Sequence, residues 1–163
     1  MKIKSIFQNL LDLFYPPLCA GCNARLLSNE EVLCLHCLSS IPYTQFHLSE
    51  NNKLEQNFFG KVQFNRAYAM AYFSKDSILQ QVIHGIKYNE KPNYAYYLGQ
   101  LYGNILKDSK ELFENAVLVP VPLHPKRFKT RGYNQAEEIC KGIVNVLPHL
   151  SINTQCITRS KNN

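Results

Sequence analysis

Four cysteines form the clearest chemical pattern in the sequence. Cys19-Ala-Gly-Cys22 and Cys34-Leu-His-Cys37 are two CxxC pairs, with residues 23–33 between them. A thiolate pair two residues apart can hold one face of a metal tetrahedron, and a second pair on a returning turn completes it with Zn–S bonds of roughly 2.3 Å. Sulfur ligands favour zinc over magnesium or calcium. We therefore predict a zinc site, with Gly21 in a left-handed turn. Its role is structural, because four ligands leave no open position for catalysis.

Two alternatives to zinc stay open at this point. The four thiols could form two disulfides, or one pair could act in redox chemistry. The N-terminal apolar stretch is interrupted by Gln8, Asn9 and Asp12, which argues against a signal peptide. A reducing cytoplasm keeps thiols free, so the metal is favoured there. His36 could replace one ligand, although the four cysteines already complete the set.

A basic run follows an apolar segment in the second half of the chain. In VPVPLHPKRFKTRGYNQ, residues 119–135, four basic side chains stand within six positions: Lys126, Arg127, Lys129 and Arg131. The next acid after them is Glu137. Such a cluster suits an anionic ligand, and His124 could add a hydrogen bond to a phosphate. The plain alternative is a solvated basic loop that binds nothing.

The elements around this run predict where it lies. Residues 116–121 have the length and apolarity of a buried strand, residues 122–133 are expected to form a loop, and a helix should begin near residue 135. Asn134 and Glu137 have the spacing of a capping box. Arg131 and Gly132 would then stand beside the unpaired N–H groups of that helix, where anions bind readily.

Apolar periodicity predicts the rest of the architecture. Helical spacing recurs in residues 3–14, 79–86, 94–105 and 136–147. Strands are expected at residues 67–73, and more weakly at 154–158. Helices that alternate with short apolar strands indicate a parallel sheet. In such sheets ligands bind beyond the carboxyl ends of the strands, which is where the basic run falls.

Length and composition limit the class of protein. With 163 residues, 45% of them hydrophobic and 18% charged, the chain can bury a core and is not globally disordered. A net charge of +6 favours phosphates, nucleic acid or acidic surfaces as partners. No segment reaches the roughly 20 apolar residues of a membrane span, so we expect a cytoplasmic protein. The composition divides it into a helix and ribbon at 1–45, a polar connector at 46–63 and an α/β region at 64–163.

Several motifs together resemble one known family. PVPLHP at 120–125 followed by RGYNQ at 131–135 is similar to the signature of the ComF competence family, which is amidophosphoribosyltransferase-like and linked to DNA uptake in natural transformation. IHGIKY at 83–88 resembles the family's helix motif. FYPPLCAGC at 14–22 with CLHC at 34–37 resembles its N-terminal zinc ribbon. The motifs stand in family order along the whole chain.

The resemblance implies a fold and a ligand. The fold would be α/β, with a four-cysteine zinc ribbon followed by a type I phosphoribosyltransferase-like parallel sheet and flanking helices. The ligand would be phosphoribosyl pyrophosphate with Mg²⁺, or another phosphorylated small molecule. The segment after VPVPL would hold the pyrophosphate, through Arg131, Gly132 and their basic neighbours. His84 and Lys87 in the helix motif are weaker site candidates.

One family feature has no counterpart in this sequence. The family binds ribose phosphate at a strand that ends in two acids followed by Thr-Thr-Gly, and neither Glu30-Glu31 nor Glu137-Glu138 is followed by such a loop. We therefore expect an incomplete phosphoribosyltransferase-like domain without transferase activity. Two other functions remain open. One is a single-stranded nucleic-acid-binding zinc-ribbon module. The other is an adaptor that docks competence or recombination proteins.

Overall fold

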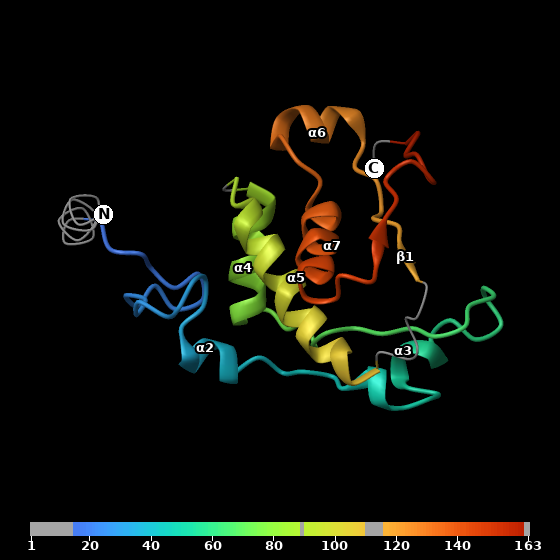
Figure 1. Ribbon diagram of the computed structural model, residues 1–163, viewed down its shortest axis with the longest axis horizontal. Helices are drawn as coiled ribbons and strands as arrows, with labels where there is room; N and C mark the ends of the chain where they lie inside the picture. The colour runs from blue at the N-terminus through green and yellow to red at the C-terminus, as the bar shows by residue number, and fades with distance from the viewer. Residues whose placement is uncertain (1–14, 89, 110–115, 162–163) are drawn as a thin grey trace.

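A computed structural model describes residues 15–88, 90–109 and 116–161 (Figure 1). The described residues form a mixed α/β structure whose elements, in chain order, are α2 (Leu35–Ser39), the 3-10 helix η1 (Phe46–Leu48), α3 (Lys53–Gln56), α4 (Ile78–Tyr88), α5 (Pro92–Leu106), β1 (Val117–Leu118), α6 (Pro125–Arg131), α7 (Gln135–Val146) and β2 (Ser151–Ile152). The helices predicted from residues 79–86, 94–105 and 136–147 are confirmed as α4, α5 and α7. The helix predicted over residues 3–14 lies outside the described residues.

The sheet is parallel, as predicted, but small. β1 and β2 pair in the register Val117↔Ser151 and Leu118↔Ile152, with α6 and α7 in the connection between them. The strand expected over residues 116–121 is thus confirmed only at its start. The strand expected at 154–158 is wrong, because the chain turns after β2. There the side-chain oxygen of Asn153 accepts a hydrogen bond from the N–H of Gln155 at 2.9 Å, as in an Asx turn.

The strand predicted at residues 67–73 is also wrong as a member of this sheet. The segment makes one isolated antiparallel bridge, between Tyr43 and Ala71. The N–H of Thr44 donates to Met70 O at 3.2 Å, and the N–H of Tyr72 donates to Pro42 O at 2.9 Å. Residues 70–72 therefore pair with residues 42–44, which follow the cysteine region, and not with β1 or β2.

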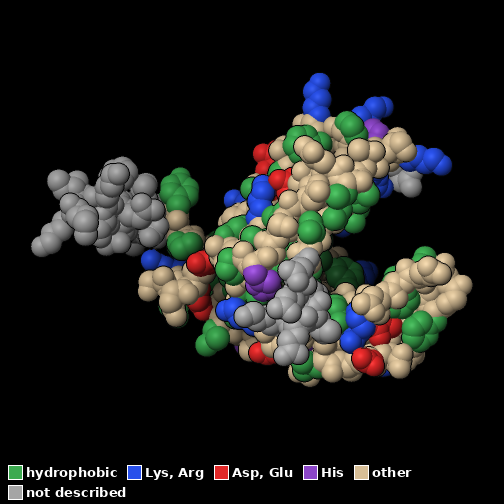
Figure 2. Space-filling model, turned by 45° about the vertical axis from the view of Figure 1, so that its right-hand side comes forward, with side chains coloured by type: hydrophobic (Ala, Val, Ile, Leu, Met, Phe, Trp, Pro, Cys, Tyr) green, Lys and Arg blue, Asp and Glu red, His purple; other side chains and the backbone are tan. Residues whose placement is uncertain are grey.

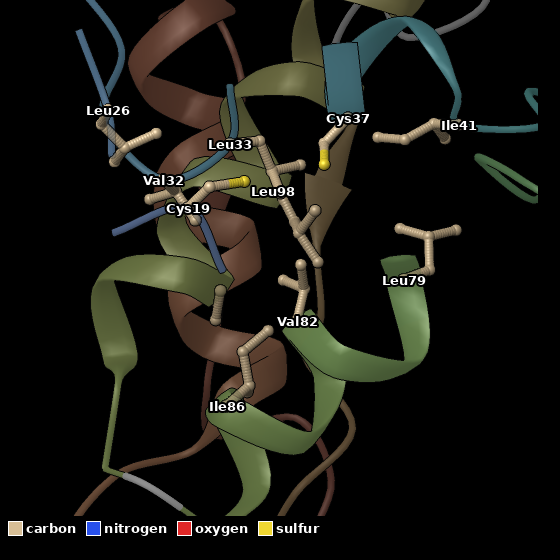
Figure 3. Close-up of a cluster of buried hydrophobic side chains, with 11 residues drawn as sticks. Cys19, Leu26, Val32, Leu33, Cys37, Ile41, Leu79, Val82, Ile86 and Leu98 are labelled. Atoms are coloured by element: carbon tan, nitrogen blue, oxygen red, sulfur yellow. The ribbon is translucent and has the colours of Figure 1, made fainter. Parts of the chain in front are cut away.

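The cysteine region and two helices share one hydrophobic core (Figure 3). Cys19, Leu33 and Cys37 point toward Val82 of α4 and Leu98 of α5, and all five are buried. A second cluster joins α5 and α7 to the chain after α7, through Leu106, Ile143, Leu147 and Leu150. Because α5 contributes to both clusters, it connects the cysteine region to the sheet.

Helices α5 and α7 cross at glycines. A Cβ on Gly142 would overlap the carbonyl oxygen of Tyr96 and would lie 2.8 Å from the backbone nitrogen of Gln100. On the facing helix, a Cβ on Gly99 would lie 2.9 Å from the Cα of Gly142. Real side chains do not approach backbone this closely, so the crossing requires glycine at both positions.

The predicted polar connector is folded around a buried carboxylate. Glu55 is 3% exposed, and it accepts hydrogen bonds from Arg66 Nε at 2.9 Å, from the N–H of Ala67 at 3.1 Å and from the N–H of Asn52 at 3.1 Å. In return, the side-chain oxygen of Asn52 accepts a hydrogen bond from the N–H of Glu55, which completes a capping box at the start of α3. This carboxylate therefore ties α3 to the chain that follows it.

Acid should weaken the contacts of the Glu55 carboxylate and so lower the stability of the fold. Glu55→Gln should remove this part of the pH dependence of the free energy of unfolding. Burial raises the pKa of Glu55, but the N–H of Ala67 and the Arg66 guanidinium together hold it below its ordinary value. A lowered native pKa stabilises the fold above the unfolded-state value of about 4.3, and the stabilisation is lost as pH falls through the native pKa. Urea unfolding of both proteins between pH 7 and pH 3.5 should therefore show the steeper acid decline in the wild type. Equal slopes would contradict this role.

Candidate metal centre and basic cleft

The two CxxC pairs meet as the sequence predicts. The four sulfur atoms of Cys19, Cys22, Cys34 and Cys37 all lie within 4.8 Å of one another. Cys22 Sγ and Cys34 Sγ are 3.7 Å apart, which matches the edge of about 3.8 Å in a tetrahedron with 2.3 Å bonds. This separation is far from the 2.05 Å of a disulfide, and all six cysteines are free thiols. The geometry is that of a four-thiolate metal site.

Local structure aims the sulfurs inward. Cys19 Sγ accepts hydrogen bonds from the N–H of Gly21 at 3.4 Å and from the N–H of Cys34 at 3.3 Å. Cys34 is the N-cap of α2, so Cys37 falls in the first turn of that helix. The left-handed conformation predicted for Gly21 is wrong, since Asn23 takes it with a φ of 59°. Gly21 is required for space, because a Cβ there would lie 2.8 Å from Ile78 Cγ2.

Two of the four thiols, Cys19 and Cys37, have pKa values shifted in opposite directions. Burial raises the pKa of Cys19, but backbone N–H groups, foremost that of Cys34, outweigh it and lower the pKa to about 6. Burial and the neighbouring sulfurs, Cys22 first, hold the pKa of Cys37 well above its ordinary value. A bound cation would lower the pKa of every thiol in such a cluster, because metal ligation deprotonates cysteine.

A basic cleft lies between the end of α4 and helix α6. Its volume is about 550 Å³, and its lining residues are Lys87, Tyr88, Glu90, Lys126, Arg127, Thr130 and Arg131. In Figure 2, lysine and arginine side chains project from the upper end of the molecule, where Figure 1 places α6. Four cations thus face one carboxylate around a single concave surface. All four cations were candidates from the sequence, Lys87 as the weaker one. Tyr88, Glu90 and Thr130 were not singled out, and the signal for them was their proximity to Lys87 and to the basic run.

The basic run forms a helix and not the loop that was predicted. Pro125 opens α6, and Gly132 ends it with a left-handed φ of 81°, the usual arrangement of proline and glycine at helix ends. His124 caps α6, because its Nδ1 accepts a hydrogen bond from the N–H of Lys126 at 3.2 Å. His124 and Gly132 therefore shape α6 and do not line the cleft. Lys129 lies on α6 but also outside the cleft lining.

Arg131 holds α6 against the end of α4. Its Nε donates to Lys87 O at 3.1 Å, and the hydroxyl of Tyr133 donates to Ile86 O nearby. Both acceptors are carbonyls in the last turn of α4, which the helix itself leaves without partners. The predicted phosphate ligand is thus also a positioning residue, since its contact with Lys87 forms one side of the cleft.

The predicted cap of α7 and the predicted site residue His84 both lie apart from the basic cleft. Asn134 caps α7 as expected, because its side-chain oxygen accepts from the N–H of Ala136 at 3.0 Å. Glu137 does not make the second bond of a capping box, and it pairs instead with Lys141 at 2.9 Å. The His84 ring lies tilted against the Tyr88 ring, with centroids 4.7 Å apart. It lines a second cleft of about 410 Å³, so His84 and Lys87 do not share a site.

The chain matches no protein-family model, no curated protein and no solved structure. Within the described ranges, no helix has the length and apolarity needed to cross a membrane.

Proposed function

We propose that the basic cleft binds a phosphorylated small molecule, with phosphoribosyl pyrophosphate and Mg²⁺ as the first candidate. The resemblance to the ComF family suggests that ligand, and a role in DNA uptake during natural competence. The observation that carries the proposal is the meeting of Lys87, Lys126, Arg127 and Arg131 around one cleft, against the single carboxylate of Glu90. A diphosphate has several ionised oxygens, and each can form strong hydrogen bonds with cationic side chains. Several cations around one cleft therefore suit such a ligand.

We propose that the cleft binds its ligand without catalysing group transfer. Paired acids are needed where the family holds ribose phosphate, and neither adjacent pair in this chain lines the cleft. Glu137 and Glu138 both bond to Lys141, at 2.9 and 2.8 Å. Glu30 accepts from the N–H groups of Leu27 and Leu35 beside the cysteines. These carboxylates bond to nearby groups of their own segments and do not line the cleft, whose one acidic side chain is that of Glu90.

We further propose that the ion held by the four cysteines is zinc. Four sulfur ligands suit zinc, and a closed set of four protein ligands has a structural role. Cys19 and Cys37 are buried in the core shared with α4, so the metal would hold the surface on which α4 packs. It would support the cleft indirectly, through the position of α4.

Lys126→Ala should weaken pyrophosphate binding by about tenfold or more, because one hydrogen bond to a charged group contributes about 1.5–3 kcal/mol. Isothermal titration with pyrophosphate and with phosphoribosyl pyrophosphate, each with Mg²⁺, measures this. Lys129→Ala is the matched control, since it removes the same charge from α6 outside the cleft. Equal losses in both variants would mean that the ligand senses only the net charge of α6, and would overturn the cleft as its site.

Single-stranded nucleic acid is the second candidate, favoured by exposed aromatic rings beside the cations. Tyr88 lines the cleft and is 69% exposed, while Phe128 of α6 is 48% exposed. Nucleic-acid bases stack on such rings while cations follow the backbone. A labelled oligothymidylate titrated at 50 and 200 mM salt should then show a steep loss of affinity, and Tyr88→Ala should weaken its binding without affecting pyrophosphate. An oligonucleotide that does not bind at the lower salt would eliminate this candidate.

A further inference from the structure

The two sides of the basic cleft differ in chemistry. The side formed by α6 is cationic, and its charged members are Lys126, Arg127 and Arg131. The side at the end of α4 is mixed, with one cation, one aromatic ring and one carboxylate: Lys87, Tyr88 and Glu90. A bare polyphosphate can use the first side but meets a like charge on the second, and such a repulsive group selects against it. The mixed side therefore suits a ligand that has an uncharged part beside its phosphates.

Tyr88 offers this uncharged part an aromatic surface. The residue ends α4 and is largely exposed. His84, one helical turn earlier, lies against the Tyr88 ring at a tilt of 42°, with the centroids 4.7 Å apart. This contact restricts the rotation of the tyrosine ring and leaves most of the ring open to the cleft. Nucleic-acid bases stack on exposed rings of this kind whatever the base, because every base has a flat π face.

Glu90 offers a hydrogen-bond acceptor beside that ring. Within the part of the chain that the structure describes, the ion pairs are those of Arg66 and Lys141, and none includes Glu90. An ionised carboxylate only accepts hydrogen bonds, so its partner on a ligand must be a donor. Ribose hydroxyls are such donors, and dinucleotide-binding folds hold them with an aspartate or glutamate near the phosphate site.

We propose that the preferred ligand of the basic cleft is a ribonucleoside diphosphate, and that Glu90 selects its ribose. The phosphates contact the cations of α6, the base stacks on Tyr88, and the ribose hydroxyls donate to Glu90. The cleft volume of about 550 Å³ lies within the range of roughly 300–1,000 Å³ that is usual for small-molecule sites. Phosphoribosyl pyrophosphate has the phosphates and the ribose but no base for Tyr88. This inference rests on the proposed function, because it requires that the cleft bind phosphates.

Isothermal titration with a matched pair of nucleotides tests the proposal. ADP and 2′,3′-dideoxyadenosine diphosphate have the same base and the same phosphates and differ in the ribose hydroxyls. We expect the wild type to bind ADP about tenfold more tightly, which is the size expected for a hydrogen bond to a charged group. Glu90→Ala should bind both nucleotides equally and should bind pyrophosphate at least as tightly as the wild type, because it removes the like charge. Glu50→Ala is the matched control, since Glu50 is an exposed glutamate outside the cleft.

Tyr88→Ala separates the base from the phosphates. It should weaken ADP binding about tenfold, because stacking of one base on an aromatic ring is worth about 1–3 kcal/mol by alanine substitution, and it should leave pyrophosphate binding unchanged. Equal losses for ADP and pyrophosphate in this variant would contradict a stacked base.

The outcomes distinguish this inference from the proposed function. A wild type that binds neither pyrophosphate nor ADP would overturn both. A wild type that binds pyrophosphate but does not prefer ADP to its dideoxy analogue would retain the phosphate site and overturn the role of Glu90. The same conclusion would follow if Glu90→Ala kept the preference for ADP. The comparison of the two nucleotides in the wild type needs no variant, so it decides the question even if Glu90→Ala misfolds.

Discussion

A Cys19→Ser chain is expected to lose its bound zinc and most of its cooperative thermal unfolding. Zinc binding by four cysteines supplies about 10–16 kcal/mol in small domains at neutral pH, whereas a whole domain is stable by only about 5–15 kcal/mol. Cys19 is also fully buried, and two backbone N–H groups donate to its sulfur. Serine offers a poor zinc ligand and leaves a smaller side chain in that core.

The loss should extend beyond the metal site. Leu33 and Cys37 pack on Val82 and Leu98, so α4 and α5 bury their apolar faces against the cysteine region. Without the metal this surface is no longer fixed, and α4 carries Lys87 of the basic cleft. We therefore expect the Cys19→Ser chain to lose pyrophosphate binding together with zinc, although no residue of the cleft has changed.

Zinc content by mass spectrometry and thermal melts by circular dichroism measure the effect. Cys156→Ser is the matched control, because Cys156 is an exposed free thiol outside the cluster. It should retain one zinc per chain and the wild-type melting temperature. Wild-type protein without metal, or a Cys19→Ser variant that melts like the control, would refute a structural zinc site. A chelator added to the wild type should reproduce the Cys19→Ser phenotype.

Local patterns in the sequence predicted the elements that bury an apolar stripe. Leu79, Val82 and Ile86 recur at helical spacing and are buried on α4. Asn134 stands where a cap was expected, because a side-chain oxygen at that position bonds the N–H two residues later whatever the tertiary context. The CxxC spacing was similarly sufficient, since the ligands of one metal must lie close together.

The missed elements lack such a stripe. Helix α6 has no buried residue, so apolar periodicity could not reveal it, and its signals were Pro125 and Gly132 at its two ends. The connector folds around Glu55 through Arg66, eleven positions later, and such a pairing is invisible to a local pattern. Its one local signal was the spacing of Asn52 and Glu55, which is that of a capping box.

The site was predicted in composition better than in geometry. A basic run in a sequence indicates an anionic ligand, but it does not show which cations line one cleft. Lys126 lines the cleft and Lys129 does not, and this difference depends on how α6 lies against the end of α4. The contact of Arg131 with Lys87 O joins residues 44 positions apart. His84 and Lys87 were expected together from their spacing on one helix. In the structure His84 contacts Tyr88 and lines the second cleft, whereas Lys87 lines the basic cleft.

Gly142→Ala is expected to destabilise the protein by about 3 kcal/mol or more, although alanine is the better helix former by about 1 kcal/mol. The added methyl group would overlap the carbonyl oxygen of Tyr96 and lie 2.9 Å from the Cα of Gly99. Both neighbours are backbone atoms of α5, which cannot rotate away as a side chain can. Helices α5 and α7 must therefore separate, which opens the second hydrophobic cluster around Leu106 and Ile143.

Urea unfolding at pH 7 measures this cost, with Lys141→Ala as the matched control on the adjacent position of α7. The control removes only surface ion pairs with Glu137 and Glu138, which contribute less than about 1 kcal/mol. Zinc content should stay at the wild-type value in both variants, because the four cysteines lie in the cluster with α4 and α5, and the contribution of α7 to that cluster is the partly buried Ile139. If Gly142→Ala were as stable as the wild type, the close crossing of α5 and α7 would be wrong. If it lost zinc as well, the two hydrophobic clusters would unfold as one unit through their shared helix α5.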